Sequence, residues 1–164
     1  IMANTNAGAA GGAIAALILT AIIYKKVDLT FVLNGALAGL VSVTAEPLTP
    51  GLGTASLIGA VGGVIVVFAV PLLDRLKIDD VVGAIPVHLL AGIWGTIAVI
   101  FTNSDANLGV QLLSIIVVGI FTFVASFVVW LILKATMGLR PTEDDEVLGL
   151  DKAEVGVEAY PEFR

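Results

Sequence analysis

The sequence predicts an all-α fold, a polytopic membrane helix bundle, and its composition is the first reason. Of its 164 residues, 58% are hydrophobic and only 13% are charged, and the mean hydropathy is +1.05. Soluble domains are about 45–50% apolar and about 25% charged, so this composition excludes a water-soluble globule. The chain has no cysteine, which also excludes thiol catalysis and cysteine-ligated metals.

The second reason is that the apolar residues form five long runs. A helix needs about 20 apolar residues to cross roughly 30 Å of hydrocarbon. The runs cover residues 7–24, 29–45, 54–73, 81–101 and 108–133. We expect each run to be a transmembrane helix, because an open sheet would leave backbone groups without partners in lipid.

The third reason is the placement of the basic residues in alternate connections. Lys25 and Lys26 follow the first run, and Arg75 and Lys77 follow the third. The other four lie near the C-terminal end: Lys134, Arg140, Lys152 and Arg164. Because basic residues are retained on the cytoplasmic side, we expect a multi-pass protein of the cell membrane. Its N-terminus is predicted to lie outside and its C-terminus in the cytoplasm.

Composition divides the chain into two parts. Residues 1–138 hold the membrane helices, and residues 139–164 form a cytoplasmic acidic tail that includes four consecutive acids at residues 143–146. No positively charged segment precedes the first apolar run, so a secretory signal is not predicted. Since the chain begins with Ile1, we expect a fragment that starts within a longer protein.

Small residues are concentrated in the predicted helices. GxxxG patterns occur at residues 35–39 and 59–63, and Gly8, Gly11 and Gly12 add small positions in the first run. Small side chains let helix backbones approach closely where lipid provides no hydrophobic drive between helices. The pattern therefore predicts a compact bundle.

The candidate functional residue is His88, which is the only histidine and lies within the fourth run. Ionisable side chains at this depth are costly and usually face a pathway or a partner. In a regular α-helix its face is shared by residues three, four and seven positions away, which are Ala84, Ala91, Gly92 and Gly95. This spacing predicts open space beside the imidazole ring.

Two interpretations of His88 remain open from these features. The ring either hydrogen-bonds a neighbouring helix, or it lines a narrow path for a small polar solute. A neutral imidazole suits either role, because it offers one donor and one acceptor. Pro86 has no backbone N–H and is predicted to loosen the helix beside it. Asn4 and Asn34 are expected to form hydrogen bonds between helices or at the interface.

Several segments resemble ammonium transporters of the Amt/Mep/Rh superfamily. Residues 79–96, which read DDVVGAIPVHLLAGIWGT, resemble the tenth helix of that family. Residues 34–45 resemble its eighth helix, and residues 4–6 (Asn-Thr-Asn) before a small-residue helix resemble its seventh. Residues 138–140 (Gly-Leu-Arg) and 149–151 (Gly-Leu-Asp), with acids between them, resemble the tail of the Amt branch.

The resemblance implies an eleven-helix inverted-repeat fold, of which this chain supplies helices seven to eleven and the cytoplasmic tail. It further implies a homotrimer with one pore per subunit. Helices one to six, and with them the first of two pore histidines, would then be absent from this sequence. His88 matches the second histidine of the pair, and Ala84 matches a pore-facing apolar residue.

The function that the resemblance implies is transmembrane transport of ammonium or ammonia for nitrogen uptake, through a hydrophobic pore lined by the histidine pair. No enzymatic reaction, cofactor, metal or nucleic acid is expected. An ammonium sensor, with the tail as its output, is the alternative function. A stand-alone five-helix protein with a structural role is the third.

The resemblance also gives the tail a regulatory role. Gly149, Leu150 and Asp151 match an ordered segment that packs under the neighbouring subunit, where PII-type signalling proteins dock. Charge alone is equally compatible with a solvated tail that avoids anionic lipid. Pro86, Leu89 and Val155 depart from residues common in the family, so details of the pore wall and of the regulation are expected to differ.

Overall fold

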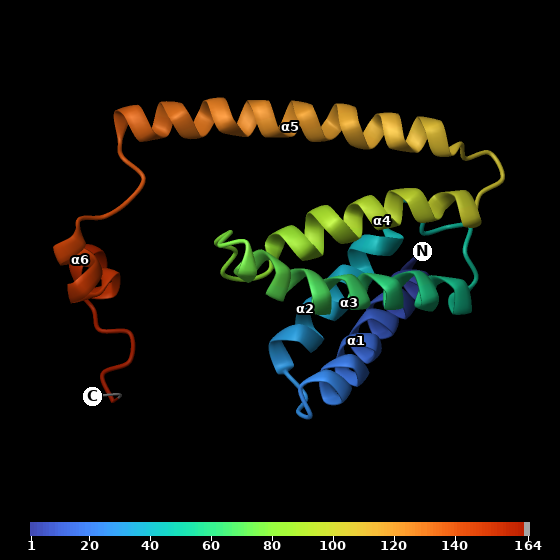
Figure 1. Cartoon of the computed structure of the whole chain (residues 1–164), viewed down its shortest axis with the longest axis horizontal. Helices are drawn as coiled ribbons and strands as arrows, with labels where there is room; N and C mark the ends of the chain where they lie inside the picture. Colours follow the sequence, from blue (N-terminus) through green and yellow to red (C-terminus); the bar gives the residue numbers. More distant parts are fainter. Residues whose placement is uncertain (163–164) are drawn as a thin grey trace. The chain divides into compact units, whose positions relative to one another are not determined.

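The computed structural model describes residues 1–162, and the described residues form helices and no strands. The predicted all-α class is therefore confirmed. The elements are α1 (Met2–Ile23), α2 (Leu29–Val43), α3 (Leu52–Arg75), the π-helix η1 (Ile85–Leu90), α4 (Ala91–Ala98), the 3₁₀-helix η2 (Val99–Phe101), α5 (Leu108–Thr136), α6 (Glu143–Leu148) and the π-helix η3 (Asp151–Val155) (Figure 1).

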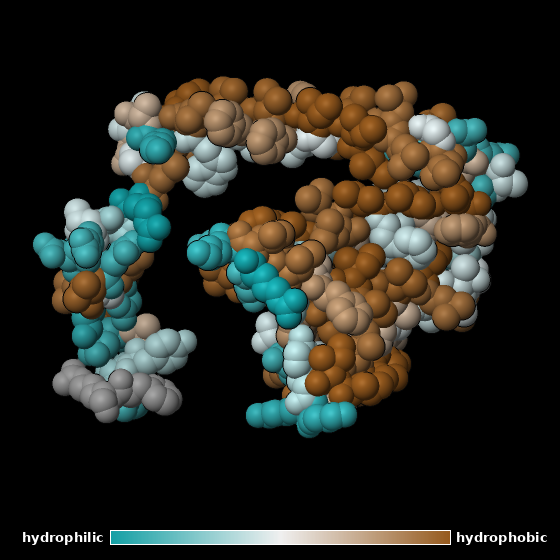
Figure 2. Space-filling model, viewed as in Figure 1, coloured by the Kyte–Doolittle hydropathy of each residue, from teal (hydrophilic) through white to brown (hydrophobic). Residues whose placement is uncertain are grey.

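The chain forms two compact units, which divide within α5. The first comprises Ile1–Val117, and the second begins at Val118. Figure 2 shows hydrophilic residues gathered in connections and in the C-terminal segment, while the long helices present hydrophobic side chains. Arg164, which contributed to the predicted orientation, lies outside the described residues, as does residue 163 of the expected tail.

The five apolar runs all become helical, but they differ in length. Among the described residues, α1, α3 and α5 are long and apolar enough to cross a membrane. α2 and the segment Ile85–Phe101 are shorter apolar helices, so five full-length spans are not seen. α2 begins at the predicted residue, where Asp28 caps it by accepting hydrogen bonds from the backbone N–H groups of Thr30 (2.9 Å) and Phe31 (3.2 Å), and it ends two residues before the apolar run does. The fourth run remains non-helical up to Gly83, whose φ is +77°.

α1 packs against both α2 and α3 through its small residues. A Cβ atom on Gly12 would collide with the carbonyl oxygen of Gly35 in α2. Cβ atoms on Gly39 of α2 and Gly59 of α3 would both collide with the carbonyl oxygen of Gly8. The three helices thus meet backbone to backbone, which confirms the close packing predicted from the glycine patterns.

One end of the first unit is tied together by amide side chains. Asn4 at the start of α1 donates through Nδ2 to the carbonyl oxygens of Pro47 (3.0 Å) and Pro50 (2.6 Å) in the α2–α3 connection. Asn103, after η2, donates to the Glu46 carboxylate of the same connection at 3.2 Å. The N-terminus and the connections without basic residues therefore lie at one end of this unit, and the expected hydrogen-bonding role of Asn4 is confirmed.

We predict that Gly12→Leu will strongly destabilise the protein. The new side chain meets the backbone of α2, and overpacking of this kind costs typically about 1–3 kcal/mol. The melting temperature of the purified full-length protein checks this. Gly53→Leu is the matched control, because a Cβ on Gly53 meets nothing within 4 Å. An equal loss in both variants would contradict the proposed contact.

Candidate functional site

His88 lies in the π-helix η1, which directly precedes α4. Val87 still donates to the carbonyl oxygen four residues back, that of Gly83, at 3.1 Å. Ala91 instead donates to the carbonyl oxygen of Pro86, five residues back. The regular α-helical ladder is therefore interrupted within this segment, and Pro86, in its first turn, has no N–H to donate. Segments with this wider turn occur frequently at functional sites.

One face of η1 is buried against the other helices. Val87 and Ala91 are 2% and 0% exposed, and they form a hydrophobic cluster with Ala38 of α2 and Val66 of α3. His88 is exposed. Within the described residues, the imidazole is thus on the side of η1 that points away from this cluster.

Ala84, the other residue predicted to line a pore, is the residue immediately before η1 and is exposed as well. The structure therefore leaves both predicted pore residues accessible on the same short segment. Neither is buried in a helix contact of the described chain. Their roles in a pore stay predictions, since the opposing wall is not formed by these residues.

The predicted open space beside His88 is wrong for two of the small residues. Ala91 is buried in the hydrophobic cluster, and a Cβ on Gly95 would lie 2.6 Å from the carbonyl oxygen of Ser42 in α2. These residues let α4 approach α2. The prediction assumed an α-helical period, but a π-helix has more residues per turn, so residues after η1 are rotated away from the histidine face.

The start of η1 is fixed by a carboxylate that was not among the predicted functional residues. Asp80 accepts hydrogen bonds from the backbone N–H groups of Ala84 (Oδ1, 2.8 Å) and Ile85 (Oδ2, 2.8 Å). These are N–H groups that the helix itself leaves without a partner. An Asp shortly before an apolar helical run is a recognised start signal, and it could have identified this cap.

A second polar contact holds the connection before η1 against α2. Asn34 donates through Nδ2 to the carbonyl oxygen of Val82 at 3.0 Å. A Cβ on Gly83 would lie 3.0 Å from the same amide nitrogen, so the small residue lets the side chain of Asn34 approach. The expected hydrogen-bonding role of Asn34 is confirmed, and Asn34 and Asp80 together position the helix that carries His88.

The predicted regulatory residues lie in a hydrogen-bonded part of the second unit. Gly149 has a φ of +96° and ends α6, and Leu150 is exposed. Asp151 accepts hydrogen bonds from the N–H groups of Ala159 (2.8 Å) and Lys152 (2.9 Å). The Ala159 N–H contributes most to holding the pKa of the Asp151 carboxyl below its ordinary value of 3.8, with help from Lys152.

Other interactions add local order to the tail. Thr142 caps α6 by accepting a hydrogen bond from the Asp145 N–H at 3.2 Å, and Lys152 forms an ion pair with Glu158 at 3.1 Å. The described residues of the tail therefore contain two short helices with local hydrogen bonds, and their regulatory role stays a prediction. Among the residues that the structure describes, no cluster of three or more His, Asp or Glu side chains could hold a metal ion.

Comparison with known proteins identifies relatives for almost the whole chain. The Ammonium Transporter Family matches residues 1–160. The chain is 38% identical to ammonium transporter Amt2 of Archaeoglobus fulgidus, with 99% of this chain and 39% of that protein aligned. It is 40% identical to ammonium transporter Amt1 of Haloferax mediterranei, with 97% of this chain and 32% of that protein aligned.

A solved structure named "Sensor Amt Protein" matches with a TM-score of 0.85 and 32% sequence identity, covering 93% of this chain and 40% of that chain. The chain thus spans about two fifths or less of the length of these relatives. The sequence matches and the structural match agree over nearly all of its residues. The chain belongs to the ammonium transporter family.

Proposed function

We propose that this chain forms the C-terminal part, helices seven to eleven and the tail, of a protein that transports ammonium across a membrane. In this proposal η1 contributes one wall of a hydrophobic pore. The observation that carries it is the exposure of His88 on η1 and of Ala84 just before it, while Val87 between them is packed against α2 and α3. The family membership supports ammonium as the transported species.

The chemistry of the pore wall suits a small neutral solute. An isolated cation at the centre of a bilayer is costly, whereas ammonia needs only hydrogen-bond partners. We infer that ammonium is deprotonated and that ammonia and the proton pass separately along a pair of histidines. His88 is the second member of that pair. Its imidazole supplies a donor and an acceptor for the solute. The methyl group of Ala84 adds an apolar surface to the same path.

The proposed orientation places the N-terminus outside and the C-terminus in the cytoplasm. Asn4 and Asn103 gather the N-terminus and the connections without basic residues at one end of the first unit. The connections with Lys25, Lys26, Arg75 and Lys77 follow the opposite helix ends. The basic residues of the first unit are thus confined to the end opposite the N-terminus, which supports a cytoplasmic position for that end.

The proposal also includes assembly and regulation. Residues 1–138 form the membrane part of each subunit of a homotrimer, and residues 139–164 form its regulatory tail. The segment around Gly149, Leu150 and Asp151 then serves as the contact for a neighbouring subunit and for a PII-type signalling protein. Support comes from the local order of this segment, which Asp151 maintains through Ala159.

An ammonium sensor is the second candidate function, and one observation favours it. The matching solved structure is named a sensor Amt protein. In a sensor, ammonium binding would change the tail and flux would be minor. Transport measurements separate the two functions, because a sensor gives a signal through the tail without substantial uptake.

We predict that His88→Ala in the full-length protein lowers ammonium uptake by about tenfold or changes its selectivity. The reason is that the solute loses a hydrogen-bond partner in a site without water, a loss of about 1–3 kcal/mol. Uptake in cells and the trimer mass of the purified protein are measured together. Val82→Ala is the control, since this exposed side chain precedes η1. Normal uptake and selectivity in a correctly assembled His88 variant would contradict the proposal.

We predict that Asp80→Ala destabilises the protein by about 0.5–2 kcal/mol, the usual cost of losing a helix cap. Two N–H groups at the start of η1 lose their acceptor, and the position of His88 becomes less defined. Melting temperature and uptake are both expected to fall. Asp79→Ala removes the neighbouring, exposed carboxylate and is the control. If both variants lose melting temperature and uptake equally, the charge in this connection is responsible and the cap is not.

We predict that local order around Asp151 is lost at low pH. Because its pKa is lower in the folded tail, its stabilising contribution is fully present above pH 3.8. That contribution disappears as the pH falls through the lower, folded value. Hydrogen exchange of the Ala159 amide across this range measures the effect. Asp151→Ala should expose this amide at neutral pH, whereas Glu154→Gln should not. Continued protection in Asp151→Ala would rule out the assigned bond.

A further inference from the structure

Trp94 is a residue of α4 whose side chain reaches across to α3. Its indole Nε1–H donates to the carbonyl oxygen of Ile58 at 2.9 Å. The indole has no other polar hydrogen and no acceptor, so this is the one hydrogen bond that the side chain can donate. Ile58 itself is 8% exposed, so the bond forms on the packed side of α3. The indole therefore gives α4 a fixed direction in addition to filling space.

The acceptor of this bond lies where α3 itself is held most tightly. Ile58 directly precedes Gly59, and a Cβ atom on Gly59 would collide with the carbonyl oxygen of Gly8 in α1. The backbones of α1 and α3 are thus in contact at the point that Trp94 binds. Because closely packed backbones have little room to shift, the indole ties α4 to a rigid part of the first unit.

The next residue of α4 makes a second contact, with a different helix. A Cβ atom on Gly95 would lie 2.6 Å from the carbonyl oxygen of Ser42, so the backbones of α4 and α2 meet here. A single contact would let α4 rotate about it. Two contacts from consecutive residues, Trp94 to α3 and Gly95 to α2, fix both the rotation of α4 and its position along its axis.

The π-helix η1 lies between this anchor and the one at its own start, where Asp80 accepts from Ala84 and Ile85. π-helices are rare and occur mostly as single turns within α-helices, so contacts from outside have to hold the wider turn. Relaxing it to an α-helix would turn one end relative to the other by about one residue, which is roughly 100° and 1.5 Å. The anchors at both ends oppose this rotation.

We propose that Trp94 is a positioning residue that holds the wide turn of η1 and so keeps His88 on the exposed face. At the α-helical period, residues three apart share a face, and His88 would turn toward the side of Ala91. Ala91 is 0% exposed and belongs to the hydrophobic cluster with Val87. The importance of His88 rests on the proposed function, whereas the effect of Trp94 on the helix does not.

The first test is amide hydrogen exchange of the purified full-length protein carrying Trp94→Phe, which keeps an aromatic ring and removes the N–H. Exchange of residues 85–91 should become about fivefold faster, the usual effect of one hydrogen bond on a local equilibrium, while α1, α2 and α3 stay as protected as in the wild type. Trp130→Phe is the matched control, because the same change is made at an exposed position of α5. It should leave the exchange of residues 85–91 unchanged.

The second test is a double-mutant cycle between Trp94 and His88, read out as ammonium uptake per assembled protein. Trp94→Phe alone should lower uptake by about fivefold or change its selectivity, for the same reason. Combined with His88→Ala it should cause no further change, because the indole acts through the imidazole. A side chain that only stabilises the bundle would lower uptake by the same factor whether or not His88 is present.

Unchanged exchange of residues 85–91 in Trp94→Phe would overturn the inference, as would an equal loss of uptake with and without His88. If Trp94→Phe does not assemble, 3-benzothienylalanine at position 94 replaces the N–H by sulfur at the same shape, and both measurements apply to it. A wild-type protein without uptake, whose exchange still responds to Trp94→Phe, would refute transport and leave the effect on the helix intact. Uptake that depends on His88 but not on Trp94 would refute the positioning role alone.

Discussion

The backbone contact of α1 with α2 and α3 is the constraint on which the rest of the first unit depends. The carbonyl oxygen of Gly8 faces Gly39 on one side and Gly59 on the other, at positions where no Cβ could be accommodated. Lipid does not drive apolar helices together, so this close van der Waals packing has to hold them. The surface formed by α2 and α3 then receives Val87, and thereby sets the direction in which η1 presents His88.

Polar groups at the helix ends determine where η1 begins, which the apolar packing alone does not. Val87 of η1 and Ala91 of α4 fix the buried face of this segment, but they do not determine where the helix starts. Asp80 determines this, because its two carboxylate oxygens satisfy the N–H groups of Ala84 and Ile85. Pro86 removes a further N–H that would need a partner. The π-helix is thus stabilised from its first turn, and His88 is held on a short, well-defined segment.

Much of the fold could be predicted from the sequence because the relevant signals are local. Apolar runs identify helices in any chain that must pair its backbone within lipid. The cap at Asp28 and the glycines at residues 35–39 act on their own helix or on the nearest neighbours. His88 was recognised for a similar reason, since one histidine in an apolar run is conspicuous without knowledge of its surroundings.

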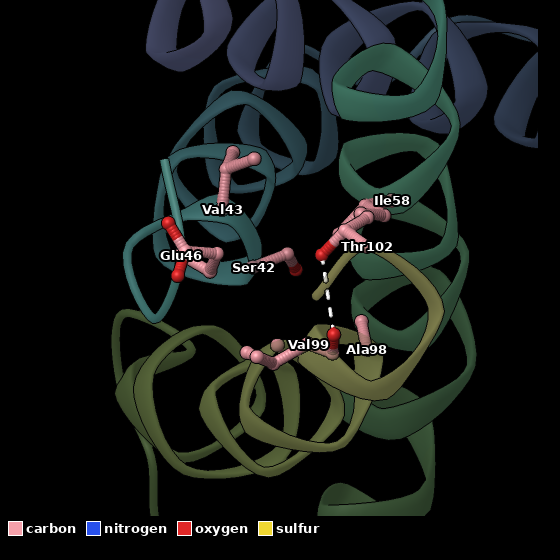
Figure 3. Close-up of a pocket in the computed structure, with 8 residues that line it drawn as sticks. Ser42, Val43, Glu46, Ile58, Ala98, Val99 and Thr102 are labelled. Carbon is pink, nitrogen blue, oxygen red and sulfur yellow. Dashed lines mark hydrogen bonds between the residues drawn. The ribbon is translucent and has the colours of Figure 1, made fainter. Parts of the chain in front are cut away.

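The site itself could be predicted only in part, because its geometry depends on a change of helical period. Counting positions at the α-helical spacing assigned Gly95 to the histidine face, but the π turn at η1 rotates it onto α2. A small cavity in the first unit (Figure 3) was missed for another reason. It joins Ser42, Glu46 and Thr102 from three segments, and their meeting follows from how the helices pack and not from any local pattern.

The exposure of His88 bears on the choice between a transporter and a self-contained bundle. An ionisable side chain that faced only hydrocarbon would be costly, so this face requires a polar path or a partner surface. The packed side of η1 already contacts α2 and α3, and Asp80 and Asn34 leave the segment little freedom to turn. The other helices of the first unit leave this face of η1 exposed. In the proposed transporter, the opposing wall of the pore belongs to the part that corresponds to the remaining length of such relatives, of which this chain spans 39%.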